Sequence, residues 1–570
     1  MTYIRKLEIM INVNYYNVKE FKNLREMLEE TEKKFGDRTA YFVKSKQSET
    51  FTKITYKEFK QDIDALGTAL IDMGLKDEKI AVIGENCYEW ATTYMATVNG
   101  VGCIVPLDKE LPEIELENLL TRSKAKAIFF TDKRKEAVIN ISKKIDTIKY
   151  FVNMTEGSSE HNILDFKEII LKGKTLLKSN NNSYINSVIN NEEMNMLLFT
   201  SGTTSKSKGV MLSHKNLCSN VAGVQTLLKF DETDTFLSVL PMHHSYEATI
   251  GFLTPISVGA SVGFCEGLKY ITKNLQELKP TILTCVPAIV EGIYRKSWIA
   301  IEQAGKKEEI EKVLSQGELS VEKARTIFKN IYEGLGGRLR LFLCGAATSA
   351  PEVVKGMRNF GVFTLTGYGL TEASPVVTLN QIENYRDASI GLCIPTIQMR
   401  VDNPNAEGVG ELVVKGPNVM IGYYEDEEQT KAVLEDGWLR TGDLVYVDDD
   451  GFIYVAGREK NVIITKNGKN VYPEEMEVLL SLNKYIKECV IFAKELKRKE
   501  DSTVAVSIFP DMEKINEDYG KISEEKVLEL IKEQVREFNK TQVSYKVIKY
   551  VELRNTEFAK TTSMKIKRYV

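Results

Sequence analysis

Residues 197–214, LLFTSGTTSKSKGVMLSH, are the strongest candidate for a ligand-binding loop in this chain. An apolar stretch runs into small and hydroxyl residues, and the candidate contacts are Thr200, Ser201, Gly202, Thr203, Thr204 and Lys208. Glycine frees the backbone, hydroxyl and amide groups donate hydrogen bonds, and lysine adds positive charge, so such a loop suits a polyphosphate. It has no GxxxxGK[ST] pattern and is therefore not a Walker loop. By composition alone, an ordinary turn is an equally good interpretation.

The loop TSGTTSKSKG resembles the phosphate loop of the adenylate-forming (AMP-binding) superfamily, which includes acyl-CoA synthetases, luciferases and nonribosomal peptide adenylation domains. The usual form is TSGTTGxPKG, so Ser205 stands in place of a glycine and Ser207 in place of a proline. Both differences fall where the family's loop is mobile. They bear on loop stiffness more than on phosphate binding.

Further segments of the family follow in the same order along the chain. CGAATS (344–349) resembles the small-residue strand end that leaves room beside adenine, with Gly345 and Ala346 as the expected contacts. WLRTGDL (438–444) resembles the family's TGD segment, in which Asp443 would accept hydrogen bonds from both ribose hydroxyls.

The segment GYGLTEASP (367–375) resembles the adenine and metal segment of the family. The resemblance implies that Tyr368 offers a flat face to the purine and that Thr371 offers its hydroxyl to the α-phosphate. Glu372 would hold Mg2+, because this hard cation prefers carboxylate oxygen. The glycines beside the tyrosine complete the expected nucleotide contacts, namely Gly367 and Gly369.

Two C-terminal segments extend the resemblance. VAGREKNVIITKNGKNVYPEEME resembles the hinge segment, with Arg458 for ribose or phosphate and Lys460 as the pivot. FAKTTSMKIKRY (558–569) resembles the terminal segment, with Lys565 at the position of the catalytic lysine and Met564 in place of the usual glycine. Taken singly, each short segment has a plainer interpretation, such as a turn or a solvated basic tail.

Two segments bear on the acid substrate. LSVLPMHHSYEAT (237–249) resembles the acid-pocket segment of long-chain acyl-CoA synthetases and places His243, His244 and Tyr246 in a substrate pocket. KPTILTCVPAIVEGIYRK (279–296) resembles a stretch of fatty-acid enzymes. The competing interpretation of the two histidines is a hydrogen-bonded pair at a strand end.

The resemblance implies an acid–thiol ligase, a long-chain fatty acid–CoA ligase that forms AMP and uses ATP, Mg2+ and CoA. The carboxylate of a fatty acid would attack the α-phosphate of ATP, and CoA would then take the acyl group from the adenylate. Lys565, Glu372 and Thr371 would be catalytic in the first half-reaction. Rotation at Lys460 would withdraw Lys565 for the second.

Several alternatives stay open. Within enzymes they are transfer to an acyl carrier protein, activation of an aryl or other acid, and a luciferase-like oxygenase. Outside enzymes, a non-catalytic nucleotide-binding protein of the same fold would be expected to lack Glu372 or Lys565, and both are present. Acyl chain length, branching and oligomeric state are not decided by these motifs.

The composition restricts the class of protein. A formal net charge of -4 gives no general attraction for nucleic acid. The eight cysteines form no CxxC pair, so we expect reduced thiols and a cytoplasmic location. The start lacks signal-peptide features and no segment suits a membrane-spanning helix, while peripheral membrane contact stays open.

The candidate site residues must be positioned by helices and strands. A chain of 570 residues is too long for a single hydrophobic core, so we expect more than one domain. Short apolar strands such as KIAVIGENC and AKAIFFTD alternate with helical segments, which predicts a layered α/β fold. We predict a large N-terminal AMP-binding domain of sheets and helices at 1–459, which holds the ATP and acyl sites. A smaller, mobile α+β domain at 460–570 would carry the catalytic lysine. Residues 171–191, rich in Lys, Asn and Ser, are expected to be a surface linker.

Overall fold

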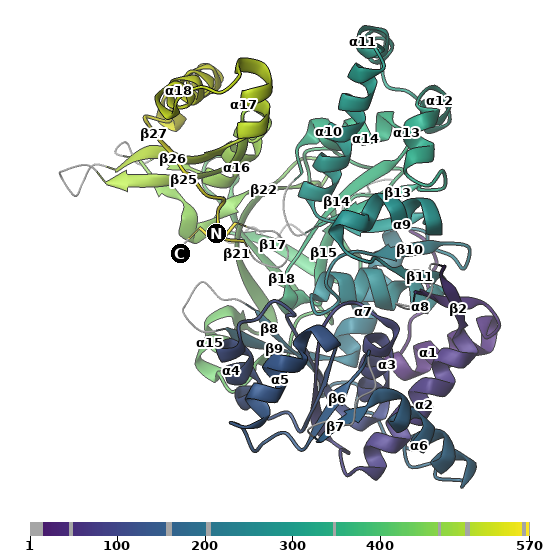
Figure 1. Ribbon diagram of the computed structural model, residues 1–570. Coiled ribbons are helices and arrows are strands. Elements are labelled where there is room, and N and C mark those ends of the chain that lie inside the picture. Colours follow the sequence, from purple (N-terminus) through teal and green to yellow (C-terminus); the bar gives the residue numbers. More distant parts are fainter. Residues whose placement is uncertain are drawn as a thin grey trace.

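The chain folds into a large N-terminal domain of stacked sheets and helices and a smaller C-terminal domain beside it (Figure 1). This mixed α/β architecture confirms the predicted fold class. The computed structural model describes residues 15–44, 50–155, 162–200, 207–345, 349–465, 469–495, 502–560 and 566–568.

An eight-stranded sheet supports one half of the large domain, and its strands β4, β3, β5, β6 and β7 run parallel. Along β3, Ile80 and Val82 enter one hydrophobic core while Ala81 and Ile83 enter another, so these four successive positions are all apolar. The strands in sheet order are β19 Gly422–Tyr423, β9 Lys208–Ser213, β8 Met194–Thr200, β4 Gly102–Leu107, β3 Glu78–Ile83, β5 Ala127–Phe130, β6 Tyr150–Asn153 and β7 Ile163–Asp165.

A nine-stranded sheet supports the other half, and its central strands β14, β13, β12, β10, β11 and β1 are parallel. The carboxyl ends of parallel strands are where open α/β sheets bind ligands. The strands in sheet order are β16 Leu392–Cys393, β15 Val376–Leu379, β14 Phe363–Gly369, β13 Leu341–Cys344, β12 Ile282–Cys285, β10 Thr235–Ser238, β11 Ser261–Phe264, β1 Thr39–Val43 and β2 Thr52–Thr55.

Helices cover both faces of these two sheets. Helices α1, α2, α3 and α7 share the core that both sheets face, α4 and α5 cover the outer face of the eight-stranded sheet, and α10 and α14 cover that of the nine-stranded sheet. The α-helices of this domain are α1 Leu24–Phe35, α2 Tyr56–Asp72, α3 Tyr88–Ala96, α4 Glu113–Ser123, α5 Lys135–Ser142, α6 Phe166–Lys178, α7 His214–Leu227, α8 Thr254–Val258, α9 Ile271–Leu278, α10 Pro287–Gln303, α11 Lys307–Ser315, α12 Val321–Ile327, α13 Lys329–Gly334, α14 Pro351–Asn359 and α15 Glu427–Val433.

Short helical turns join these elements. Two of them, η1 and η4, are π-helical, a wide form that is frequent at functional sites. The turns are η1 Thr97–Val101, η2 Asp132–Arg134, η4 Glu247–Leu253, η5 Leu268–Tyr270, η6 Thr371–Ala373, η7 Glu459–Asn461 and η8 Ser544–Lys546.

A five-stranded antiparallel sheet follows the nine-stranded one and leads to the C-terminal domain. Its strands are β17 Gln398–Asp402, β18 Gly410–Lys415, β20 Leu434–Glu435, β21 Trp438–Val447 and β22 Ile453–Arg458. In it, Asp443 of β21 lies directly opposite Arg458 of β22. Two residues named separately by their motifs are therefore cross-strand neighbours.

The C-terminal domain has a core of its own, built from a three-stranded sheet and the apolar sides of three helices, α16, α17 and α18. Val527, Ile531 and Val535 recur at helical spacing and are the buried stripe of α18. The elements are β23 Ile463–Ile464, β24 Asn470–Val471, α16 Pro473–Leu480, β25 Ile486–Glu495, β26 Ser502–Pro510, α17 Met512–Tyr519, α18 Glu524–Lys540 and β27 Tyr550–Leu553.

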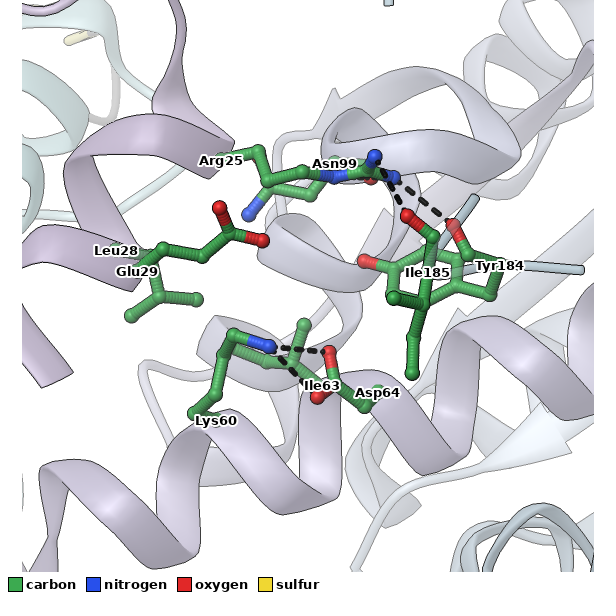
Figure 2. Close-up of a pocket in the computed structure, with 9 residues that line it drawn as sticks. All are labelled: Arg25, Leu28, Glu29, Lys60, Ile63, Asp64, Asn99, Tyr184 and Ile185. Carbon is green, nitrogen blue, oxygen red and sulfur yellow. Dashed lines mark hydrogen bonds and ion pairs between the residues drawn. The ribbon is translucent and has the colours of Figure 1, made fainter. Parts of the chain in front are cut away.

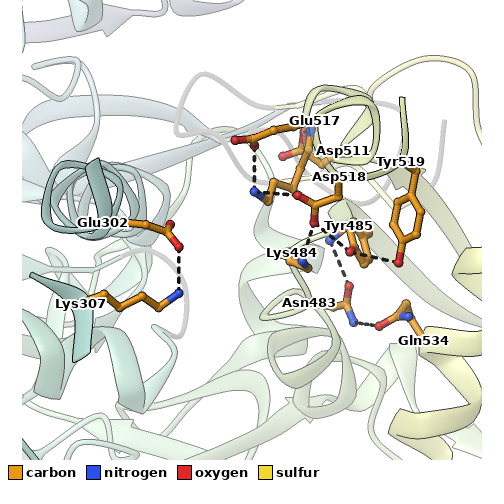
Figure 3. A network of polar contacts seen from close by, with 11 residues as sticks. Glu302, Lys307, Asn483, Lys484, Tyr485, Asp511, Glu517, Asp518, Tyr519 and Gln534 are labelled. Atoms are coloured by element: carbon orange, nitrogen blue, oxygen red, sulfur yellow. Dashed lines mark hydrogen bonds and ion pairs between the residues drawn. The ribbon is translucent and has the colours of Figure 1, made fainter. Parts of the chain in front are cut away.

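Polar contacts fasten α17 to the turn after α16, as Figure 3 shows. Asp518 accepts a hydrogen bond from the Tyr485 hydroxyl at 2.9 Å and pairs with Lys484 and, at 3.2 Å, with Lys514. Between the domains, the exposed Arg295 of α10 pairs with Asp511 at 3.3 Å, and Val478 packs against the outer core of the nine-stranded sheet.

The expected linker at 171–191 is wrong in two respects. Helix α6 continues to Lys178, because its apolar side packs on α2. Beyond it, the Tyr184 side chain is buried, and Arg25 donates hydrogen bonds to the carbonyls of Tyr184, Ile185 and Ser187. Among the residues that the structure describes, no helix is long and apolar enough to cross a membrane.

Candidate active site

A cavity of about 680 Å3 lies where the large domain meets the C-terminal domain. Residues from widely separated motifs line it. From the large domain they include Lys208, Leu370, Glu372, Tyr423, Thr441 and Gly442, and from the segment 459–472 they include Glu459, Val462, Ile464, Asn470 and Tyr472. The phosphate-loop, metal, TGD and hinge segments therefore converge on one cavity.

Asp443 is buried beside this cavity and is already engaged by two partners. The Tyr368 hydroxyl donates a hydrogen bond to its Oδ2 at 2.6 Å, and the Arg458 Nε donates to its Oδ1 at 2.8 Å. Burial, followed by the neighbouring carboxylate, raises the pKa of Tyr368, and the same carboxylate raises that of Arg458. Each carboxylate oxygen has a second lone pair, so Asp443 has acceptor capacity left for ribose hydroxyls.

Glu372 lines the cavity, and the Tyr423 hydroxyl donates a hydrogen bond to its Oε1 at 2.9 Å. Next to it, the Thr371 hydroxyl lies 3.2 Å from that of Ser245. No group of three or more His, Cys, Asp or Glu that could hold a metal occurs within the described ranges. One carboxylate nevertheless fits Mg2+, because this ion usually takes one or two protein carboxylates and completes its shell with phosphates and water.

Lys208 points to the same cavity from the start of β9. Its Nζ donates to Gln429 Oε1 at 2.9 Å and lies 4.7 Å from the centre of the Tyr423 ring. Thr200 ends the partner strand β8 and pairs with Lys208 across the hairpin. The other expected loop contacts lie outside the described residues, namely Ser201, Gly202, Thr203 and Thr204.

The expected acid-pocket residues lie in the loop after β10 and the helix that follows. The rings of His243 and His244 pack against each other with centroids 4.2 Å apart, and burial lowers the pKa of His243 well below its usual range. The Tyr246 hydroxyl donates to the Leu343 carbonyl at 2.8 Å. Its ring covers Gly345, where a Cβ would lie 3.0 Å from the ring, so a larger residue would press on the tyrosine.

The adenine-side glycines have different surroundings. Gly345 is buried at the end of β13, and Ala346 lies outside the described residues. A Cβ on Gly369 would lie 2.1 Å from the Pro375 carbonyl oxygen, and one on Gly367 would lie 2.9 Å from that of Thr378. Gly369 is therefore required by close backbone packing, which sets the path of the chain between Tyr368 and Thr371.

Lys460 lies in the turn η7, exposed, between β22 and β23. Lys565 lies outside the described residues, and the nearest described residues are Lys560 before it and Ile566 after it. Lys560 pairs with Ile566 in an isolated bridge, and Arg568 binds Glu477 of α16 and, through Nη1, the Ile491 carbonyl at 3.1 Å. These flanking residues do not line the cavity, whereas β23 and β24 do.

A second, much smaller cavity of about 10 Å3 lies among α1, α2, η1 and the segment around Tyr184 (Figure 2). Arg25 uses its guanidinium on backbone carbonyls there, and Lys60 pairs with Asp64 at 2.7 Å. The buried Asn99 side chain and Tyr184 hydroxyl have no hydrogen-bond partner among the described residues. The space suits one ordered water, so this is a structural site rather than a substrate site.

Motif reasoning missed several residues of the main site. Tyr423 contacts both Glu372 and Lys208, and Ser245 contacts Thr371. No local signal marks Tyr423, because it reaches the site only through the pairing of β19 with β9. Ser245 lies inside the acid-pocket segment, and its position there was the only available signal.

The large α/β domain and the small α+β domain thus share one cavity, which residues of both domains line. Residues 28–424 match the model of the AMP-binding enzyme family, and residues 460–569 match that of the AMP-binding enzyme C-terminal domain. The chain belongs to the AMP-binding enzyme family.

Its curated relatives carry names of acyl-CoA synthetases. Fatty acyl-CoA synthetase B of Dictyostelium discoideum is 25% identical over 569 residues, which covers 92% of this chain and 82% of that protein. Long chain acyl-CoA synthetase 4 of Arabidopsis thaliana is 30% identical and covers 74% of this chain and 68% of that protein. The chain is thus an adenylate-forming ligase whose homologues include long-chain acyl-CoA synthetases.

Solved structures share the fold at lower identity. The anthranilate CoA ligase AuaEII in complex with anthranoyl-AMP is 19% identical, with a TM-score of 0.76 over 97% of this chain and 96% of that one. ATP-bound MatB from Rhodopseudomonas palustris is 22% identical, with a TM-score of 0.72 over 95% of this chain and 97% of that one. These likenesses extend over nearly the whole of each chain.

Proposed function

We propose that this protein is a long-chain fatty acid–CoA ligase that forms AMP. The observation that carries the proposal is the convergence of Lys208, Glu372 and the Tyr368–Asp443–Arg458 group around one cavity between the domains. A cavity of that volume is the right size for a nucleotide with part of a second substrate. The names of the curated relatives support the fatty acid as the substrate class.

The first half-reaction is adenylation. A carboxylate oxygen of the acid attacks the α-phosphorus of ATP, and the bond to the bridging oxygen breaks so that pyrophosphate leaves with the electron pair. Two anions must be held together, so positioning and charge neutralisation are the main tasks of the protein. Asp443 would hold the ribose, Lys208 and Thr371 would face the phosphates, and Lys565 would lie between carboxylate and phosphate.

Mg2+ would be held by Glu372 together with the phosphates of ATP, and it supplies positive charge where negative charge develops. Tyr423 is expected to orient the Glu372 carboxylate through its hydrogen bond to Oε1, which leaves Oε2 available. Lys208 in turn lies over the Tyr423 ring, so a single aromatic side chain orders both charged groups.

The second half-reaction is thioester formation. The CoA sulfur attacks the carbonyl carbon of the adenylate, and the bond from that carbon to the phosphate oxygen breaks so that AMP leaves. We propose that the C-terminal domain turns at Lys460 between the half-reactions, because β23 and β24 face the cavity here while the residues that flank Lys565 do not. This orientation suits the thioester step.

Aryl-acid ligases are the second candidate, because anthranilate and benzoate CoA ligases are among the structures with this fold. Pyrophosphate release with and without CoA separates the candidates when it is measured across acids of two to eighteen carbons and several aryl acids. Because each buried methylene contributes about 0.8 kcal/mol, kcat/KM should rise with chain length until the pocket ends. Preference for acetate or benzoate over dodecanoate would reject the fatty-acid assignment.

The acceptor is tested in the same assay. CoA should accelerate turnover and appear as acyl-CoA, whereas an acyl carrier protein supplied at the same concentration should not. Faster transfer to the carrier protein than to CoA would replace the proposed ligase with an acyl carrier protein ligase.

A further inference from the structure

A fully buried glutamate lies directly after the acid-pocket loop. Glu247 begins the π-helix η4, and its side chain is 0% exposed. The Ser238 hydroxyl donates to its Oε1 at 2.6 Å, and the Thr284 hydroxyl donates to its Oε2 at 2.6 Å. Ser238 ends β10 and Thr284 lies near the end of β12, so the carboxylate joins the carboxyl ends of two parallel strands.

Within the described part of the chain, this carboxylate forms no ion pair with a lysine, arginine or histidine, and its side-chain partners are the two hydroxyls. Burial raises its pKa to about 7, against the effect of the two hydroxyl donors. Burying such a group is costly unless its hydrogen bonds are made, so a purely space-filling role would be served better by an apolar residue. The contacts of its neighbours indicate what it does.

The loop before Glu247 is held at both ends by one hydrogen-bonded chain. At the first end, Asn86 Nδ2 donates to the Leu240 carbonyl at 2.7 Å, and the Met242 amide donates to Asn86 Oδ1 at 3.0 Å. The same Asn86 amide donates to Ser238 Oγ at 2.9 Å, and Ser238 donates to Glu247. Residues 240–246, which include the packed histidines, are therefore fastened before and after.

Residues 245–249, at the start of η4 and just before it, face two different parts of the molecule. On one side, Ser245 contacts the Thr371 hydroxyl at 3.2 Å and Thr249 donates to the Ser374 carbonyl at 3.2 Å. Glu247 lies between them in sequence and reaches the strands of the nine-stranded sheet instead. The side toward Thr371 serves the nucleotide segment, and the side toward the sheet supports the acid-pocket loop.

The wide turn of η4 leaves room for the buried carboxyl. A Cβ at Gly251 would lie 2.5 Å from the Glu247 side chain, so only glycine permits the carboxyl to fold over that turn. Glu247 is thus placed by its own helix as well as by its two donors.

We infer that Glu247 is a positioning residue for the acid substrate: it fixes the loop 240–246, which ends with Tyr246, against β10, β12 and β13, so that the pocket wall is formed before the acid binds. It does not touch the reacting atoms. The inference rests on the proposed function, because it concerns the acid site of an acid–CoA ligase.

The test is steady-state adenylation with the acid and ATP varied separately. In Glu247→Ala, both hydroxyls lose their acceptor and the loop loses its anchor, so KM for the acid should rise about tenfold or more. KM for ATP should change less than about twofold, because Asp443 and Glu372 are untouched. Glu247→Gln should restore most of the acid affinity, since an amide accepts from one hydroxyl and donates to the other.

Asp234→Asn is the matched control. Asp234 is a buried acid at the opposite end of β10, where it pairs with Arg340 at 2.7 Å and accepts from Thr281. Its loss should lower stability and leave both KM values unchanged. If Glu247→Ala does not fold, Glu247→Asp replaces it, because that change withdraws the carboxyl by one methylene and should still raise KM for the acid.

Equal increases in both KM values, or effects no different from those of Asp234→Asn, would overturn the positioning role. Unchanged acid KM in Glu247→Asp and Glu247→Gln together would do the same. A wild-type protein that releases no pyrophosphate with any acid would remove the proposed function and this inference with it, and that result is distinct from an active wild type with an unaffected variant.

Discussion

The large domain and the C-terminal domain present their parts of the candidate site differently. In the large domain, Asp443 and Glu372 are already paired with tyrosines, and the sheets behind them are buried on both faces. The C-terminal domain has its own core and meets the large domain through contacts that include the exposed Arg295–Asp511 pair. This difference suits a reaction in which a fixed nucleotide site is completed in turn by two faces of a movable domain.

The largest effect is expected from Lys565→Ala, which would remove the proposed contribution of the C-terminal domain to adenylation. Loss of a charged donor at the reacting atoms should lower adenylation on the order of 100-fold or more. Thioester formation from synthetic acyl-adenylate and CoA should be largely spared. Lys567→Ala, two residues away in the same basic tail, is the control. Parallel loss of both half-reactions would mean that Lys565 is structural.

Within the large domain, Glu372→Ala and Asp443→Ala should separate two roles. Glu372→Ala should lower kcat on the order of 100-fold, because the negative charge that the Glu372-bound metal would neutralise develops in the transition state. Asp443→Ala should mainly raise KM for ATP, because the ribose that Asp443 would bind is unchanged during the reaction. Rate and ATP-affinity measurements on both variants decide this. An unchanged kcat in Glu372→Ala would contradict the assignment.

Lowering the pH should reduce the stability of the large domain through protonation of His214. Burial lowers the pKa of this histidine from 6.5 to about 4, while its Nδ1 accepts from the Leu24 amide and its Nε2 contacts the Val98 carbonyl. Because the folded-state pKa is depressed, the unfolded chain binds the proton first, and stability falls as pH drops from 6.5 toward 4. The loss should be about 2 kcal/mol between pH 7 and pH 5.

Urea unfolding of wild type and His214→Gln at several pH values measures this contribution. The variant is less stable at pH 7, but the difference between the two proteins should shrink as the pH falls. A constant difference from pH 7 to pH 5 would show that His214 is not the acid-sensitive group.

Lys460→Pro tests the movement that the comparison of domains implies. A pivot must change φ, and the proline ring fixes φ near -65°. We expect one half-reaction to survive and the other to drop at least about tenfold, with Lys460→Ala close to wild type. Single-turnover measurement of each step, with circular dichroism as the folding control, checks this. Two normal half-reactions in a folded proline variant would exclude a hinge at Lys460.

The smallest effect is expected from Arg295→Ala. The Arg295 side chain is 69% exposed, and exposed ion pairs contribute at most about 1 kcal/mol. Removing the pair should change the balance between domain orientations slightly and leave overall stability almost unaltered. A large change in either half-reaction would show that the C-terminal domain is held more firmly than the described contacts indicate.

The alternation of strands and helices could be predicted because a strand that is buried on both faces has a continuous apolar run, as in β5 and in residues 80–83 of β3. The segment 171–191 was mispredicted for a related reason. Its polar residues belong to the exposed side of the end of α6 and to the exposed segment after Lys178, while Tyr184 is buried by Arg25 and α2, which come from a distant part of the chain.

The sequence by itself determined which residues could do chemistry, because motif spacing is local: Thr371 and Glu372 follow Tyr368 at fixed distances along the chain. Only the tertiary structure decided their partners. Tyr423 reaches Glu372 through strand pairing, Arg458 reaches Asp443 across a hairpin, and Glu247 finds its donors on two neighbouring strands. A hydrogen bond requires its two atoms to lie about 3 Å apart in space, whatever the distance between the residues along the chain. The partners are therefore determined by tertiary packing rather than by motif spacing.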